Sequence, residues 1–228
     1  MEILSNGFTL ELCEGAFPLS TDSIALAEFV KLPKNADVLD LGAGCGTLGL
    51  LLCAKDDACC VTGVEIDEKA HKTALLNIEK NKLEGRNTSI CADLTSVSAF
   101  LKPGSFHVCL SNPPYFTGGF KSKTLPDARQ ETLCSLDAVF AAAAFALRYG
   151  GDFFIVHRPE RLSELCTCGA KYHLEPKRLR LLRHRKSGPV SLVLLQCRKG
   201  GKTGLSWEEV HLHEDDGSPS DYYRTLYH

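Results

Sequence analysis

The tetrapeptide Asn112-Pro113-Pro114-Tyr115 combines residue types that can hold a flat ring carrying an amino group. The side-chain carbonyl of Asn112 and the backbone carbonyl of Pro113 are hydrogen-bond acceptors, and the prolines restrict the backbone and bring no amide donor. An aromatic amino nitrogen becomes nucleophilic when acceptors hold its hydrogens in a pyramidal geometry. Tyr115 offers a face for stacking a flipped base, a contact of roughly 1–3 kcal/mol. These residues predict a catalytic turn, and the alternative is a rigid turn with a purely structural role.

A glycine-rich turn at residues 40–46 reads Asp-Leu-Gly-Ala-Gly-Cys-Gly and follows an apolar run. Glycines let a backbone pass close to a ligand without side-chain collision. The spacing is tighter than the G-x-G-x-x-G fingerprint of dinucleotide sites. We interpret the segment as a cofactor turn, although a structural turn is the open alternative. Its expected cofactor-binding residues are Asp40, Gly42, Ala43, Gly44 and Gly46.

Two further acidic residues follow predicted strands. Glu65 ends a strand about twenty residues beyond the turn, where a carboxylate can accept hydrogen bonds from both ribose hydroxyls. The alternative for Glu65 is a strand end that faces solvent. Asp93 follows the next predicted strand, and the competing interpretation is a helix cap for a segment that begins at Thr95.

The elements around these motifs alternate between strands and helices. We predict strands at 36–41, 60–65, 88–91, 106–111 and 152–157, and helices at 21–30, 47–54, 67–81, 136–149 and 159–172. This order predicts a parallel, doubly wound sheet with right-handed crossovers. The segments 174–183 and 190–197 are joined by a loop too short for a crossover helix, so we expect them to pair antiparallel.

A parallel sheet that ends in an antiparallel hairpin resembles the class I methyltransferases, which implies an α/β, Rossmann-like sheet of seven strands. Residues 40–46 resemble motif I of such enzymes, and residues 112–115 resemble motif IV of amino-methyltransferases. The whole chain is similar to the bacterial tRNA1(Val) adenine-N6-methyltransferase family. Besides these motifs, the resemblance rests on Asn-Pro-Pro-Tyr-Phe-Thr-Gly-Gly at 112–119, Ala-Arg-Gln-Glu at 128–131, Lys-Gly-Gly-Lys at 199–202 and Asp-Tyr-Tyr at 221–223.

The resemblance implies S-adenosylmethionine as cofactor and methyl transfer to the adenine beside the anticodon. It implies that Asp93 and the backbone amide of Leu94 meet the cofactor adenine, and that Thr21 and Asp22 fold over its methionine end. It extends the cofactor site to Ile66 and Asn112. Gln130, at a position where the family pattern leads us to expect histidine, and a chain that ends soon after Tyr227 are departures that bear on the substrate.

Other acceptors remain open at this point. Asn-Pro-Pro-Tyr also occurs in enzymes that methylate a glutamine amide of release factors, but these carry a helical domain ahead of the core, and only about 35 residues precede the first predicted strand here. A ribosomal-RNA amino-methyltransferase is a further alternative. The alternative outside enzymes is an RNA-binding module that retains the cofactor pocket.

The charge balance requires a local patch for any RNA contact, because the formal net charge is −2 and the isoelectric point is about 6.4. A basic stretch and three cations near the catalytic turn are our candidates, and a solvated strand edge is the alternative for the stretch. The predicted RNA-binding residues are Lys121, Lys123, Arg129, Lys177, Arg178, Arg180, Arg183, Arg185 and Lys186.

The 228 residues suit one domain, with a lead-in at 1–35 and a C-terminal appendage at 199–228, which we expect Trp207 to pack against the sheet. Eleven scattered cysteines, an N-terminus without a leader pattern and the lack of a long apolar segment predict a cytoplasmic protein without a membrane span. Cys166 and Cys168 lack a second pair nearby, so we expect no metal site. A monomer is favoured.

Overall fold

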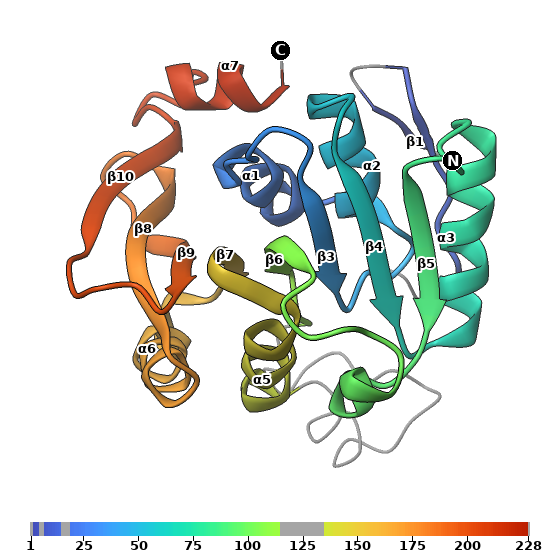
Figure 1. The fold of residues 1–228 in the computed structure, drawn as a ribbon. Coiled ribbons are helices and arrows are strands. Elements are labelled where there is room, and N and C mark those ends of the chain that lie inside the picture. The colour runs from blue at the N-terminus through green and yellow to red at the C-terminus, as the bar shows by residue number, and fades with distance from the viewer. Residues whose placement is uncertain (1, 5–6, 15–18, 115–134, 228) are drawn as a thin grey trace.

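The computed structural model describes residues 2–4, 7–14, 19–114 and 135–227 (Figure 1). The strands are β1 (Glu2–Ile3), β2 (Thr9–Leu10), β3 (Asp37–Leu41), β4 (Cys60–Glu65), β5 (Asn87–Cys91), β6 (Phe106–Ser111), β7 (Leu147–His157), β8 (Leu174–Arg185), β9 (Val190–Lys199) and β10 (Ser206–His213). The helices are α1 (Thr21–Phe29), α2 (Thr47–Lys55), α3 (Glu68–Lys80), η1 (Leu94–Ala99), α5 (Leu136–Ala146), η2 (Pro159–Arg161), α6 (Leu162–Lys171) and α7 (Asp221–Tyr227).

The main sheet has the strand order β10-β8-β9-β7-β6-β3-β4-β5. Strands β7, β6, β3, β4 and β5 run parallel, and β9 is antiparallel to both β7 and β8. The predicted mixed sheet with its C-terminal antiparallel pair is therefore confirmed. The short lead-in strands β1 and β2 form a separate antiparallel pair.

The expected number of seven strands is wrong, because the main sheet has eight. The additional strand, β10, comes from the predicted appendage and pairs parallel to β8 at the edge of the sheet. Its first four residues are exposed, so it lacks the apolar alternation that marks a strand in sequence. Trp207 is 66% exposed on this strand, so the expectation that it packs the appendage against the sheet is also wrong.

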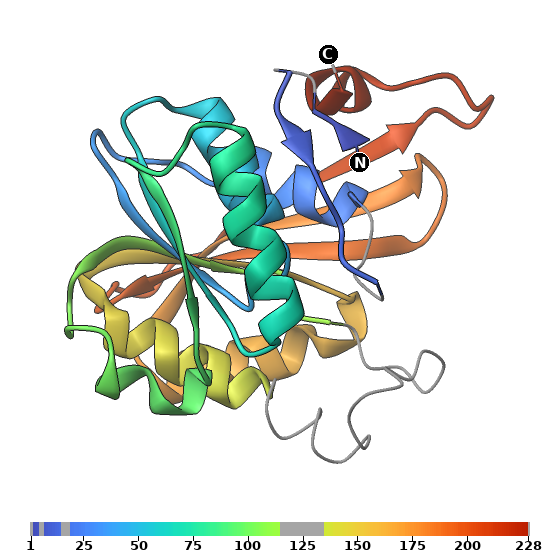
Figure 2. The same ribbon diagram turned by 90° about the vertical axis from the view of Figure 1, so that its right-hand side faces the viewer.

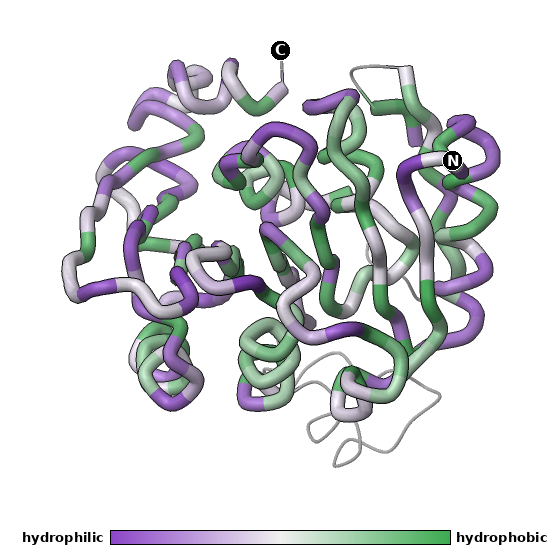
Figure 3. Tube along the Cα trace, in the orientation of Figure 1, coloured by the Kyte–Doolittle hydropathy of each residue, from purple (hydrophilic) through white to green (hydrophobic). Residues whose placement is uncertain are grey.

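Helices cover both faces of the sheet. Helices α1, α2 and α3 lie on one face and α5 and α6 on the other (Figure 2). Adjacent residues of β7 lie on opposite faces of the sheet and pack into its two hydrophobic cores. Phe154 contacts Phe29 of α1 edge-on with ring centroids 5.9 Å apart, and Phe153 contacts Phe140 of α5 with ring centroids 4.9 Å apart. The central strands and α5 are accordingly hydrophobic along much of their length (Figure 3).

Most element boundaries follow local sequence signals. Ser20 and Asp67 cap α1 and α3 by accepting from backbone amides three residues on. The predicted helix at 136–149 is too long, because Leu147 takes an extended conformation and begins β7 opposite Phe106. Among the described residues, no helix is both long and apolar enough to cross a bilayer.

Candidate functional site

Four neighbouring parallel strands bring the predicted site residues to one edge of the sheet. In the order β6-β3-β4-β5, their carboxyl ends carry Asn112, the glycine-rich turn, Glu65 and Asp93, respectively. Ligands of open α/β sheets bind at this edge. The sequence motifs therefore share one location in the fold.

The glycine-rich turn depends on backbone conformations that favour glycine. Gly42, Gly44 and Gly46 have φ values of +78°, +55° and +83°, in the left-handed region. The amides of Gly42 and Ala43 donate to the carbonyl of Val64 at 2.9 and 3.0 Å, which ties the turn to β4. Gly46 then begins α2 as its N-cap residue.

The turn fits a ligand that approaches the backbone closely. A Cβ built at Gly42 or Gly44 would have no heavy atom of the described chain within 4 Å, so the space beside these residues is open. On the opposite side, a Cβ at Gly63 would lie 2.8 Å from the Cβ of Ala43, so glycine is needed there for the turn to pack on β4. No role was predicted for Gly63, although a glycine within a strand indicates that another part of the backbone approaches closely.

Glu65 connects the turn to the end of β4. Its Oε2 accepts from the Gly44 amide at 2.8 Å, and its Oε1 accepts from the Asp67 amide at 2.8 Å. Each carboxylate oxygen can accept another hydrogen bond. The carboxylate is thus held at the rim of the turn, and its contact with ribose hydroxyls stays a prediction.

Asp40 lies beneath the turn and is almost completely buried, with 1% of its surface exposed. It lines a small cavity together with Asn87, and neither of its carboxylate oxygens has a hydrogen-bond partner among the described residues. Burial, and secondarily the charge of Glu65, raise the pKa of Asp40 to about 8. An uncharged carboxyl below the turn is the consequence at neutral pH.

Asp93 acts as a cap in the structure. Its Oδ1 accepts from the Thr95 amide at 2.8 Å at the start of η1, as the competing interpretation had it. Leu94 is buried, and Ile66 is 44% exposed beside Glu65. The predicted adenine contacts of these residues stay predictions.

The catalytic turn is joined to both the sheet and helix α1. Ser111 donates its hydroxyl to the carbonyl of Leu41 at 2.8 Å, which binds the end of β6 to the end of β3. Asn112 donates from Nδ2 to the Ser23 Oγ at 3.0 Å. Pro113 is buried and Pro114 partly buried, whereas Tyr115 lies outside the described residues. No role was predicted for Ser23 from the sequence, where it belongs to the polar run Ser20-Thr21-Asp22-Ser23 of the stretch that is similar to the family.

The positions of Thr21 and Asp22 in α1 do not test their predicted contacts with the cofactor. Thr21 places its Oγ1 2.9 Å from the hydroxyl of Tyr227, and Asp22 lies partly exposed in the first helical turn. Both assignments stay predictions.

The basic stretch is largely paired with carboxylates. Arg180 is 7% exposed and forms ion pairs with Glu28 and Glu208. The remaining pairs are Arg178 with Glu208 at 3.8 Å, Arg183 with Glu209 at 3.2 Å and Lys186 with Glu214 at 3.1 Å. Lys177 donates to a backbone carbonyl, and Arg185 is exposed and forms no ion pair in the described part of the chain, although its charge helps to lower the pKa of Asp215. Lys121, Lys123 and Arg129 lie outside that part. RNA binding by these nine residues stays a prediction.

Metal-binding residue types do not cluster in the described ranges: no group of three or more His, Cys, Asp or Glu side chains there is placed to hold an ion. Cys168 is buried and Cys166 partly buried on α6.

Comparison with known sequences identifies relatives over most of the chain. The family model described as "Methyltransferase small domain" matches residues 19–164. A tRNA1(Val) (adenine(37)-N6)-methyltransferase of Vibrio parahaemolyticus is 31% identical, covering 95% of this chain and 90% of the relative. One with the same name from Tolumonas auensis is 30% identical, covering 92% and 88%.

Solved structures show the same fold. A predicted O-methyltransferase from Agrobacterium tumefaciens superimposes with a TM-score of 0.76 at 21% identity, over 90% of this chain and 95% of that one. A 16S rRNA N2 methyltransferase from T. thermophilus, solved with AdoMet and guanosine, gives a TM-score of 0.58 at 24% identity, over 82% and 45%. Together with the sequence matches, this fold places the chain in the methyltransferase small domain family, among the tRNA1(Val) (adenine(37)-N6)-methyltransferases.

Proposed function

We propose that this protein transfers a methyl group from S-adenosylmethionine to the N6 amino group of adenine 37 in a tRNA of the tRNA1(Val) type. Relatives of that name match the chain over nearly its whole length. The observation on which the proposal depends is the junction of the two motifs. The turn of β3 and the Asn112 turn of β6 lie on adjacent strands, and the Ser111 hydroxyl links their ends at 2.8 Å.

The residues of this junction have separate tasks in the proposed reaction. The turn at 42–46 and Glu65 bind the cofactor, whose sulfonium supplies an electrophilic methyl group. The carbonyls of Asn112 and Pro113 hold the hydrogens of the adenine amino group and aim its nitrogen, so the chain contributes mainly alignment. Tyr115 stacks on the base in this proposal.

A tRNA substrate also implies a binding partner and a cellular location for the protein. The proposed partner is tRNA, and the proposed location is the cytoplasm. We also propose that the chain works as a monomer with one catalytic domain spanning residues 1–228, in which the appendage contributes β10 to the sheet.

The test uses a methyl-labelled cofactor with separate pools of tRNA, ribosomal RNA and release factor. We expect label in tRNA, recovered as N6-methyladenosine after digestion to nucleosides. Label in ribosomal RNA or in a release-factor glutamine would replace the proposal with one of the alternatives. Cofactor binding without label in any pool would favour a binding module without catalysis.

The matched variant in this test is Asn112→Ala. We expect it to lose most turnover while its cofactor affinity, measured by calorimetry, stays close to that of the parent, because the side chain acts on the acceptor base. An equal loss of cofactor affinity would contradict this assignment of Asn112.

A further inference from the structure

Helix α1 reaches the catalytic turn through one side chain. The Oγ of Ser23 accepts a hydrogen bond from the Nδ2 of Asn112 at 3.0 Å, across 89 positions of sequence. Ser23 is only 8% exposed, so water has little access to compete for this contact. The two residues come from different layers of the fold, α1 and the end of β6.

This contact bears on the chemistry because the side-chain amide of Asn112 is planar and has one acceptor and one donor end. An amine is held by the carbonyl end, and a rotated amide would present its own hydrogens to the substrate's hydrogens. With Nδ2 bonded to Ser23, the Oδ1 end lies on the far side of the amide from Ser23. The serine therefore restricts the rotation that would exchange the two ends.

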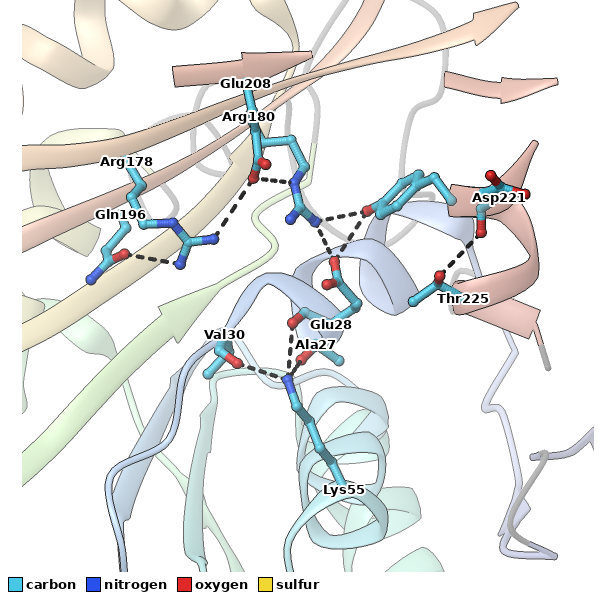
Figure 4. A network of polar contacts seen from close by, with 11 residues as sticks. Ala27, Glu28, Val30, Lys55, Arg178, Arg180, Gln196, Glu208, Asp221 and Thr225 are labelled. Atoms are coloured by element: carbon cyan, nitrogen blue, oxygen red, sulfur yellow. Dashed lines mark hydrogen bonds and ion pairs between the residues drawn. The ribbon is translucent and has the colours of Figure 1, made fainter. Parts of the chain in front are cut away.

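The helix that carries Ser23 is anchored at its carboxyl end by three elements (Figure 4). Arg180 of β8 is bonded to Glu28 and also donates to the Tyr222 hydroxyl of α7 at 3.1 Å. From α2, the ammonium of Lys55 donates to the carbonyls of Ala27, Glu28 and Val30 at 2.8, 2.9 and 2.7 Å. These last carbonyls of a helix otherwise lack intrahelical partners.

The amino end of α1 has its own anchor. Thr21 meets the hydroxyl of Tyr227 of α7 at 2.9 Å, and Ser20 caps the first turn by accepting from the Ser23 amide at 3.4 Å. With both ends attached, α1 presents Ser23 from a fixed position. A residue can orient another side chain only if its own position is fixed by the surrounding structure.

We propose that Ser23 is a positioning residue that orients the Asn112 amide for catalysis, and that helix α1 holds Ser23 in place. This inference rests on the proposed function, because it assigns Asn112 the task of holding the acceptor amine. It adds a residue outside both sequence motifs to the machinery of the reaction.

The test compares Ser23→Ala with Ser105→Ala on the full chain. Ser23→Ala is expected to lower kcat about 10- to 100-fold, as a small misplacement of a reacting group does, with the KM for tRNA and the Kd for cofactor unchanged. Ser105→Ala also removes one serine hydrogen bond, to the carbonyl of Lys102 at 2.8 Å, ahead of the amino end of β6 and away from Asn112. It is expected to leave kcat unchanged. Parental kcat in Ser23→Ala overturns the proposal.

A double-mutant cycle separates positioning from a general disturbance. If Ser23 acts through Asn112, Ser23→Ala costs little further rate in an Asn112→Ala background, measured in single turnovers. The same fold loss in both backgrounds overturns the proposal. Should Ser23→Ala not fold, Ser23→Cys nearly preserves the volume and replaces the oxygen by a weak acceptor, with the same kcat loss expected.

A spectroscopic readout keeps this inference separate from the proposed function. The side-chain NH2 resonances of Asn112, identified by their absence in Asn112→Ala, are expected to shift and exchange faster with water in Ser23→Ala. Unchanged resonances overturn the inference whatever the substrate is. A parent enzyme that methylates no tRNA, with the resonance change present, overturns only the proposed function.

Discussion

At the scale of single residues, Asp40 has the clearest energetic consequence. Its pKa is raised to about 8 from an ordinary value of 3.8, first by burial and then by the charge of Glu65. Well below pH 3.8 the carboxyl is protonated in both the folded and the unfolded chain. Between the two pKa values only the folded state holds the proton, so its contribution to the free energy of unfolding falls by about 1.4 kcal/mol per pH unit as the pH rises.

Replacing Asp40 by Asn tests this pH dependence. Between pH 5 and pH 8, the free energy of unfolding should fall less steeply for Asp40→Asn than for the parent, because the variant has no proton to lose. Urea denaturation at several pH values measures both slopes. Asp57→Asn is the control, because Asp57 is fully exposed and should keep the parental slope. Parallel curves for Asp40→Asn and the parent would contradict the assignment of the slope to this carboxyl.

At the scale of elements, the ion pairs of β8 attach helix α1 to the C-terminal segment. The side chain of Arg180 is 9% exposed and meets Glu28 of α1, which is 31% exposed, as well as Glu208 of β10. Removing one partner of a buried ion pair leaves the other charge without compensation. A residue that sequence analysis assigns to RNA binding thus has a visible role within the fold.

Arg180→Ala should lower the free energy of unfolding by about 3 kcal/mol, because Glu28 and Glu208 lose their buried partner. Arg185→Ala, on the same strand but exposed, should change it by less than about 0.5 kcal/mol. Chemical denaturation of both variants at neutral pH provides the comparison. Similar values for the two would show that Arg180 does not anchor α1.

Sequence patterns predicted the elements whose signals are local. The helix that begins at Asp67, the glycine turn and the alternating strands were predicted, since each signal depends on neighbours in the chain, whereas Ser20 was not identified as the cap of α1. Strand β10 was not predicted, because its first four residues are exposed and nothing local in the sequence shows that it pairs with β8, where Glu208 and Glu209 meet arginines. The Ser23 contact was equally hidden, since nothing in the sequence shows which serine faces Asn112.

At the scale of the whole molecule, the charge distribution limits how RNA can be held. The net charge is −2, and Glu208, Glu209 and Glu214 offset cations of the basic stretch. Phosphate contacts depend on charge that the protein has not already compensated. Within the described residues of this stretch, Arg185 is exposed and forms no ion pair, although its charge helps to lower the pKa of Asp215, so it is the cation best suited to meet a phosphate.

The salt dependence of tRNA binding tests this distribution of charge. Each phosphate contact adds about 0.7 to 0.9 to the slope of log affinity against log salt concentration. Arg185→Ala should therefore reduce the slope by about that amount, whereas Arg183→Ala should change it less, because Glu209 already offsets its charge at 3.2 Å. Glu209→Gln should steepen the slope by releasing Arg183. If Arg185→Ala leaves the slope unchanged and Arg183→Ala lowers it, the paired arginines would be the ones that bind RNA, and their glutamates would have to separate from them on binding.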